Sequence, residues 1–248
     1  MINPCLMEAT GGTRDFLEGE ILLFDKPYGW TSFDLVGKVR NFLSRQLKVK
    51  RIKVGHAGTL DPLATGLMVL CTGKATRQVD QLQAQEKEYV ATLKLGATTP
   101  SFDLETSEES QYPTAHITRE KVEECLLRFT GLITQVPPVF SAVKIDGKRA
   151  YKHARAGHDP GLKAKTVEIM EIELLDYAMP LVTLRIRCSK GTYIRALARD
   201  IGEDLQSGAY LTALRRTRSG DFYVHNAFTF EKFRESFPAL TGKTSYNQ

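Results

Sequence analysis

The stretch GHAGTLDPLATGLMVLCTGKATR, from Gly55 to Arg77, carries the strongest signal in this chain. It places a single acidic residue, Asp61, between Leu60 and Pro62, directly before a segment apolar enough to be buried. The simplest interpretation of an Asp-Pro pair is the start of a turn, in which the aspartate side chain accepts a backbone N–H. The flanking glycines indicate more, because they permit close approach by another backbone or by a substrate. These glycines are Gly55, Gly58 and Gly66.

Apolar neighbours would also remove water from the Asp61 carboxylate. A desolvated carboxylate needs a hydrogen-bonding or cationic partner, so we expect one elsewhere in the sequence. The apolar residues concerned are Leu60, Leu63, Leu67 and Val69.

The composition indicates a folded globular protein. Its 248 residues are 42% hydrophobic and 25% charged, and no apolar run approaches the length of a membrane-spanning helix. Residues 1–18 have no basic segment followed by a long apolar one, so we expect a flexible leader and a cytoplasmic protein. The four cysteines are far apart in the sequence, which argues against a zinc site and a disulfide framework.

Several common catalytic motifs are absent from the sequence. Gly73-Lys74 is followed by Ala75, and Gly66 lies too far upstream, so the phosphate-loop pattern fails in spacing and in its hydroxyl. The five histidines form no HExxH set, and there is no GxSxG elbow. These observations disfavour nucleotide triphosphatases, metal hydrolases and serine hydrolases.

Hydrophobic periodicity predicts interspersed strands and helices without a regular βαβα alternation. We therefore expect an α+β fold on a mixed sheet, in one catalytic domain. Strands are predicted at 20–26, 67–71, 89–95, 167–175 and 182–188. Helices are predicted after a cap at Thr31 or Ser32, over 75–83, from Thr118 and over 192–206. Residues 47–54 are predicted to form an edge strand or a basic arm, and residues 211–217 are predicted to form a hairpin with 222–224.

Positive charge is bunched, although the net charge is only +5. Bunched positive charge suits a polyanionic partner, but ordinary solvated faces explain any one cluster equally well. The clusters lie within 45–53, 144–155 and 215–218, while acidic residues gather at 103–109 in what reads as a surface loop.

Four motifs in order closely resemble the bacterial tRNA pseudouridine-55 synthases of the TruB family. They are LLFDKPYGWTSFD (22–34), the opening stretch, KEYVATLKLG (87–96) and CSKGTYIRALARDIG (188–202). The resemblance spans about residues 19–228 and implies the pseudouridine synthase fold, a mixed, mostly antiparallel sheet flanked by helices and loops. It implies a catalytic domain at 19–230 with an RNA-contacting insertion at 136–165. Residues 231–248 would then form a short tail, without the RNA-binding domain that longer members append.

The resemblance also implies the chemistry of the site. Asp61 matches the essential aspartate, which attacks either the sugar or the base of a uridine, and Arg195 matches the arginine that pairs with it. Without the motif, an arginine on an exposed helix face is the simpler interpretation. Tyr89 matches the aromatic residue that stacks on the flipped uracil, although a strand tyrosine can equally be core. Residues that would line the substrate site are His56, Lys26, Tyr193, Ile194 and Leu214.

The reaction so implied is an isomerisation of uridine in the T-arm loop of tRNA. It needs no cofactor and no metal, and the target nucleotide must be flipped out of its stack. We expect a monomer without an obligate protein partner. A catalytically silent RNA-binding or tRNA-folding protein on the same scaffold is the alternative, and a synthase directed to another RNA by partner proteins is a third. RNA backbone contacts are expected from Lys144, Lys148, Arg149, Lys152 and Arg155.

Overall fold

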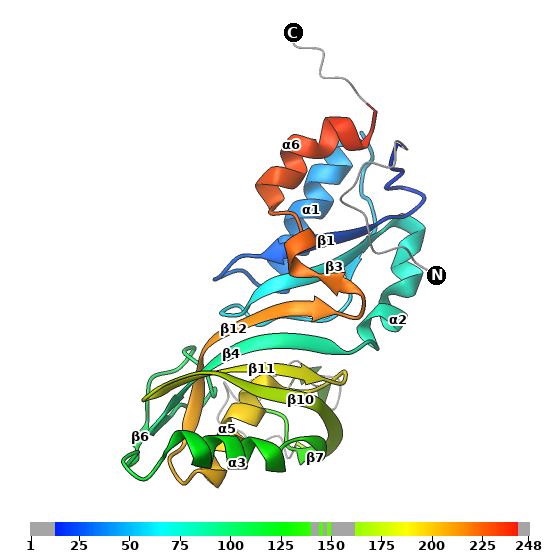
Figure 1. The fold of residues 1–248 in the computed structure, drawn as a ribbon. Coiled ribbons are helices and arrows are strands. Elements are labelled where there is room, and N and C mark those ends of the chain that lie inside the picture. Colours follow the sequence, from blue (N-terminus) through cyan, green and yellow to red (C-terminus); the bar gives the residue numbers. More distant parts are fainter. Residues whose placement is uncertain (1–12, 140–143, 146–147, 150–161, 243–248) are drawn as a thin grey trace. The chain divides into compact units, whose positions relative to one another are not determined.

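The computed structural model describes residues 13–139, 144–145, 148–149 and 162–242 (Figure 1). The chain divides into two compact units. Unit 1 comprises Met1–Lys87 and Arg215–Gln248, and unit 2 comprises Glu88–Leu214. Strand β12 (Ala209–Ser219) contributes its first residues to unit 2 and its last to unit 1.

Unit 1 is built on a small mixed sheet in the order β1-β3-β12. Strands β1 and β2 pair antiparallel with β3, β13 pairs antiparallel with β12, and β12 pairs parallel with β3. The elements of unit 1 besides β12 are β1 (Ile21–Lys26), α1 (Ser32–Gln46), β2 (Val54–His56), β3 (Thr65–Thr72), the 3-10 helix η1 (Gly73–Gln78), α2 (Val79–Gln83), β13 (Phe222–Tyr223), the 3-10 helix η2 (Val224–Asn226) and α6 (Phe230–Leu240).

Helix α1 is capped by Thr31, one of the two predicted candidates, and this cap is a capping box. The Thr31 hydroxyl accepts the Asp34 N–H at 3.0 Å, and the Asp34 carboxylate accepts the Thr31 N–H at 2.8 Å. These reciprocal bonds satisfy two backbone donors at the helix start. Helix α1 lies beside α6 (Figure 1), and Phe42 of α1 packs edge-on against Phe233 and Phe237 of α6. Residues 231–240, within the expected tail, therefore form most of a helix that packs on the unit 1 core.

Unit 2 is an antiparallel assembly around strands β10 and β11. The strand order is β12-β4-β11-β10-β7, and β10 pairs antiparallel with both β11 and β7. Its elements besides β12 are β4 (Lys87–Leu95), β5 (Ala97–Thr98), β6 (Ser110–Gln111), α3 (Arg119–Arg128), β7 (Gly131–Gln135), β8 (Lys144–Ile145), β9 (Lys148–Arg149), β10 (Lys165–Ala178), β11 (Leu181–Cys188) and α5 (Ile194–Asp204).

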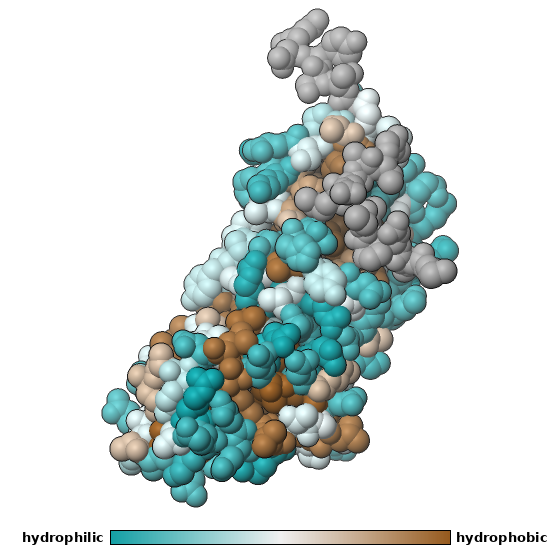
Figure 2. All heavy atoms as spheres, in the orientation of Figure 1, coloured by the Kyte–Doolittle hydropathy of each residue, from teal (hydrophilic) through white to brown (hydrophobic). Residues whose placement is uncertain are grey.

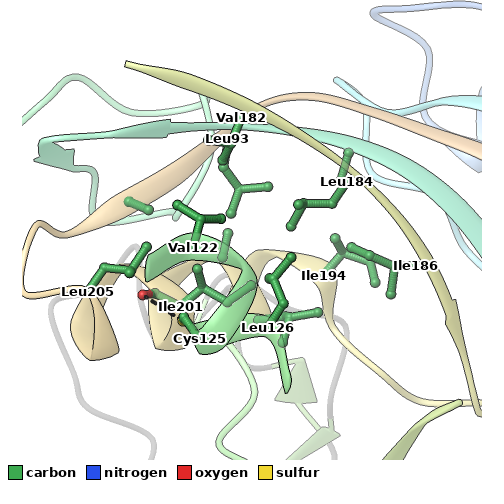
Figure 3. Packing of buried hydrophobic residues seen from close by; sticks show 14 of the residues in the cluster. Leu93, Val122, Cys125, Leu126, Val182, Leu184, Ile186, Ile194, Ile201 and Leu205 are labelled. Atoms are coloured by element: carbon green, nitrogen blue, oxygen red, sulfur yellow. Dashed lines mark hydrogen bonds between the residues drawn. The ribbon is translucent and has the colours of Figure 1, made fainter. Parts of the chain in front are cut away.

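The core of unit 2 lies between this sheet and helices α3 and α5 (Figure 3). On β11, Val182, Leu184 and Ile186 point into the core, because alternate residues of a strand face the same side. The Cys125 thiol of α3 lies 4.0 Å from the Ile201 carbonyl oxygen of α5 and donates to it, which joins the two helices. Burial in this core raises the pKa of that thiol to about 12, so Cys125 stays protonated.

Most predicted elements are confirmed. Thr118 caps α3 by accepting the Lys121 N–H at 3.4 Å, and Gly131, just after this helix, has a left-handed conformation with φ of +96°. Strands β12 and β13 form the predicted hairpin. The α+β class with a mixed, mostly antiparallel sheet is also confirmed.

Of the two alternatives predicted for 47–54, the edge strand is wrong up to residue 53, and the basic arm stays a prediction. Lys48 has a φ of +54°, which turns the chain back on α1, and the Ile52 N–H donates to the Ser44 hydroxyl at 3.1 Å. These local bonds compete with a strand ladder. Only Val54, at the start of β2, is in a strand.

No helix among the described residues is long and apolar enough to cross a membrane. Hydrophobic side chains reach the surface of unit 2 among hydrophilic ones (Figure 2). Leu127 and Leu132 are each 75% exposed. Scattered exposed hydrophobic residues are normal for a folded protein and indicate no site by themselves.

Candidate active site

Asp61 lies in the loop between β2 and β3 of unit 1. The Ala64 N–H donates to the Asp61 carbonyl oxygen at 3.1 Å, which closes a turn with Pro62 at its second position, where proline is favoured. The preceding residue is fixed as well, since the Ser32 hydroxyl accepts the Leu60 N–H at 2.8 Å and donates to the Leu60 carbonyl oxygen at 2.9 Å. The Asp-Pro turn is therefore present, and α1 holds it through Ser32.

Lys26 holds the other side of this turn. Its side chain is fully buried, and its ammonium donates to the carbonyl oxygens of Pro27, Trp30 and Pro62 at 3.0, 2.6 and 3.2 Å. Burial lowers the pKa of Lys26 to about 8; the negative charge of Asp61 opposes this effect and the positive charge of Arg216 adds to it. Lys26 thus acts on the backbone beside Asp61, and its burial is compensated by three acceptors.

His56 ends β2, shortly before the Asp61 loop. Its ring is partly buried, and its Nδ1 has no hydrogen-bond partner among the described residues. Burial lowers the pKa of His56 below its usual value, which favours the neutral ring at pH 7. A neutral, partly buried ring is suited to packing against a base and not to binding phosphate.

Arg195 lies in the first turn of α5 in unit 2, and it is only 4% exposed. Its Nη1 donates to the Ser101 carbonyl oxygen at 3.1 Å, and its Nε lies 3.6 Å from Oδ2 of Asp103. The interpretation as an exposed helix arginine is wrong. A buried guanidinium held beside a carboxylate has a fixed orientation.

Asp103 is a buried partner of Arg195 that the sequence did not reveal. We expected it in an exposed acidic loop, but its exposure is 6%. Its backbone carbonyl accepts the hydroxyls of Thr99 and Ser101 at 2.8 and 3.2 Å, and its Oδ1 accepts the Glu105 N–H at 2.9 Å. The small hydroxylated residues around Asp103 in the sequence were the signal that could have shown a tightly folded loop.

The remaining predicted site residues of unit 2 lie around its core. Tyr89 on β4 and Leu214 on β12 are partly buried and pack against the cluster that contains Ile194. Tyr193 precedes α5, and its N–H donates to Oε1 of Gln135 at 2.8 Å. Tyr89, Ile194 and Leu214 therefore share one hydrophobic cluster. The predicted pairing of Asp61 with Arg195 joins residues of different units and stays a prediction.

The arginines of the basic cluster at 215–218 are paired or buried within the protein. Arg215 binds both carboxylate oxygens of Asp25, at 3.1 and 2.6 Å, and Arg218 pairs with Glu86. Arg216 is 1% exposed. Internal pairing with carboxylates accounts for the positive charge of Arg215 and Arg218, so this cluster requires no polyanionic partner.

The predicted RNA contacts fall largely outside the described side chains. Backbone pairing joins β8 and β9 in an antiparallel ladder, with Lys144 opposite Arg149 and Ile145 opposite Lys148. Lys152 and Arg155 lie outside the described residues.

Comparisons with known proteins agree across the chain. The family described as TruB family pseudouridylate synthase (N terminal domain) matches residues 44–194, and the tRNA pseudouridylate synthase B C-terminal domain matches residues 195–244. The tRNA pseudouridine synthase B of Phocaeicola vulgatus is 62% identical over 221 residues, which cover 89% of this chain and 94% of the relative. The protein of the same name from Parabacteroides distasonis is 64% identical over 207 residues, 84% of this chain and 88% of the relative.

Solved structures share the fold. A chain in the crystal structure of a Cbf5-Nop10-Gar1 complex superposes with a TM-score of 0.67 at 30% identity. The match covers 90% of the present chain and 55% of that chain. A structure of an H/ACA RNP bound to a substrate RNA containing 2'-deoxyuridine gives a TM-score of 0.65 at 27% identity, over 93% of this chain and 57% of that one.

Proposed function

Because this chain belongs to the TruB family of pseudouridylate synthases, we propose that it converts uridine to pseudouridine at position 55, in the T-arm loop of tRNA. In this isomerisation the bond from C1' of the ribose to N1 of uracil breaks, the base turns, and C5 bonds to C1'. C5 loses a proton and N1 gains one, so no atoms or electrons are exchanged with a co-reactant. The close relatives are named tRNA pseudouridine synthase B, which supports tRNA as the substrate.

Asp61 is the proposed nucleophile, acting on the sugar or on the base. This assignment is supported by the hydrogen bonds that hold the backbone on both sides of Asp61, because a carboxylate reacts efficiently only when it is held in place. Ser32 binds both backbone groups of Leu60, and Lys26 binds the Pro62 carbonyl, so the residues on either side of Asp61 are fixed by buried side chains.

Arg195 and Tyr89 complete the proposed site. Arg195 would steady the Asp61 carboxylate during the reaction, and Tyr89 would stack on the flipped uracil and relay the proton from C5. The buried environment of Arg195 and the partly buried position of Tyr89 support these roles, since neither residue is a freely solvated side chain. His56, Tyr193, Ile194 and Leu214 would line the pocket. Flipping the base costs a few kcal/mol, roughly what stacking on an aromatic ring returns.

The RNA backbone would be held by the basic residues of the 136–165 insertion. Lys144, Lys148 and Arg149 lie on the paired strands β8 and β9, which places three cations on one short ladder. A plot of log affinity against log salt concentration has a negative slope, and each phosphate contact that is removed should make this slope shallower by about 0.7 to 0.9. Measuring RNA affinity across salt concentrations for Lys148→Ala and for the exposed control Lys232→Ala tests this role.

We also propose that the enzyme works as a monomer in the cytoplasm. Three cysteines, Cys71, Cys125 and Cys188, are buried and free of disulfides, which suits a reducing compartment. Light scattering of the purified protein with and without tRNA tests the monomer, and a dimer of the free protein would overturn it.

The function is tested by mapping pseudouridine in unmodified tRNA transcripts. We expect a single modified uridine in the T-arm loop of the wild-type transcript, and no modification when that uridine is replaced by cytidine. Modification at another uridine would overturn the assigned position. Binding without any modification would instead support the alternative of a catalytically silent RNA-binding protein.

A further inference from the structure

Arg216 is among the largest fully buried side chains of the structure, and it lies on β12 next to the Asp61 loop. Arginine side chains carry a positive charge in proteins, and burying such a charge is costly without hydrogen bonds. A leucine could fill the same space without that cost. The presence of an arginine therefore calls for a role that packing does not supply.

The guanidinium reaches both ends of the segment 58–67, which comprises most of the Asp61 loop and the start of β3. Its Nε donates to the Leu67 carbonyl oxygen at 2.7 Å, and its Nη2 donates to the Gly58 carbonyl oxygen at 3.2 Å. One residue precedes the Asp-Pro turn and the other follows it. A single planar group with donors at fixed angles thus sets the separation of the two ends of this segment.

The backbone of Arg216 is locked against the same loop. Arg216 pairs with Gly66 in the parallel ladder of β12 and β3, and a Cβ added at Gly66 would lie 2.3 Å from the Arg216 carbonyl oxygen. Gly58 has a φ of +111°, and its added Cβ would lie 3.4 Å from Nη1 of Arg216. The strand that carries Arg216 cannot shift relative to the loop without opening these contacts.

The charge of Arg216 also reaches neighbouring site residues. After burial, which is the larger cause, it helps to lower the pKa of both Lys26 and His56. Arg216 is therefore close enough to influence the site electrostatically, although it is 1% exposed and has no surface to offer an RNA.

From this geometry we infer that Arg216 is a positioning residue, which holds the two ends of the segment 58–67 together so that the Asp61 carboxylate is correctly placed for reaction. The inference rests on the proposed role of Asp61. Lysine at this position keeps the charge but has one ammonium in place of the fork, so it cannot bind both carbonyls in the same geometry. Methionine removes the charge and all donors.

The test compares Arg216→Lys and Arg216→Met with Arg218→Lys, a matched change two residues along the same strand at a residue that pairs with Glu86. Single-turnover rates and RNA affinities are measured on unmodified tRNA and expressed per folded enzyme, as determined by circular dichroism. We expect both Arg216 variants to lose about 10- to 100-fold in rate, because small misplacements of a reacting group have effects of this size. RNA affinity should stay within about twofold, and the Arg218 variant should match the wild type in both.

Hydrogen exchange provides a readout that a general loss of stability would not give. Exchange in a peptide covering residues 57–67 should accelerate in Arg216→Lys, while peptides from α3 and β10 stay unchanged. A wild-type rate in Arg216→Lys, or a rate and an affinity that fall together, would overturn the inference. These outcomes are separate from a failure of the proposed function, which would appear as an inactive wild type or an active Asp61→Asn variant.

Discussion

Gly66→Ala tests whether the close approach of β3 and β12 shapes the site. At a φ of +101° an alanine is strained, and its Cβ would lie 2.3 Å from the carbonyl oxygen and 2.8 Å from the nitrogen of Arg216. Both atoms belong to backbone, so a side-chain rotation cannot relieve the contact. Left-handed strain costs roughly 1–2 kcal/mol. Overpacking adds roughly 1–3 kcal/mol, which gives a total destabilisation of about 2–5 kcal/mol.

Two glycines allow the strain and the clash to be separated. Gly131 has a nearly equal φ of +96° with nothing within 4 Å of an added Cβ, and Gly29 of unit 1 has a φ of +80° with the same open space. Alanine at either position should therefore show the strain alone. The excess loss in Gly66→Ala should be about 1–3 kcal/mol, from overpacking. This corresponds to a melting temperature lower by about 2–12 °C than in the controls.

The assay is urea and thermal unfolding of the three variants, followed by circular dichroism. We also expect Gly66→Ala to lose more turnover per folded enzyme than Gly131→Ala, because a displaced β12 moves the Asp61 loop. Equal losses of stability in the three variants would refute the reasoning, since the clash would then contribute nothing.

The other predictions concern charges in and near the site. Arg195→Met should abolish turnover while sparing most of the RNA affinity, as measured by filter binding beside a single-turnover assay; equal losses would contradict its assigned role. Asp103→Asn should also lower the turnover rate, since it removes the carboxylate that orients Arg195. A wild-type rate would show that the Ser101 carbonyl alone is enough to orient Arg195. The pKa of Lys26 is about 8 in the folded protein, below the lysine pKa of about 10.4 in the unfolded chain, so the unfolded chain binds this proton more tightly. The free energy of unfolding should therefore rise between pH 8 and pH 10.4 by about 3 kcal/mol relative to Lys26→Met. Urea titrations across that range measure the difference, and parallel pH profiles for the two proteins would contradict it.

Local patterns in the sequence predicted the elements of the fold well. Helix caps depend on a hydroxyl near a helix start; Thr118 caps α3 as predicted, and Thr31, one of the two predicted candidates, caps α1. The edge strand predicted over 47–54 does not form before residue 54, because the chain turns back onto the end of α1, where the Ser44 hydroxyl accepts the Ile52 N–H. Periodicity alone does not report such side-chain to backbone bonds.

The motif residues of the candidate site could be predicted from the sequence. The burial of Asp103 and Arg216 could not, because partners far away in the sequence decide it. Asp103 belongs to an acidic stretch and Arg216 to a basic one, and both patterns are typical of solvated surfaces. Both are buried, because Arg195 lies beside Asp103 and backbone carbonyls accept from Arg216. A partner about ninety to one hundred and fifty residues away leaves no local trace in one sequence.

The most direct test of the account is the turnover of Asp61→Asn beside Asp80→Asn, an exposed aspartate on α2 of the same unit. Each protein is incubated with unmodified tRNA, and pseudouridine in the T-arm loop is quantified together with RNA affinity. We predict that Asp61→Asn forms none while binding tRNA within about threefold of the wild type, and that Asp80→Asn is fully active. Pseudouridine formation by Asp61→Asn at the wild-type rate would contradict the assignment of this carboxylate as the reacting group.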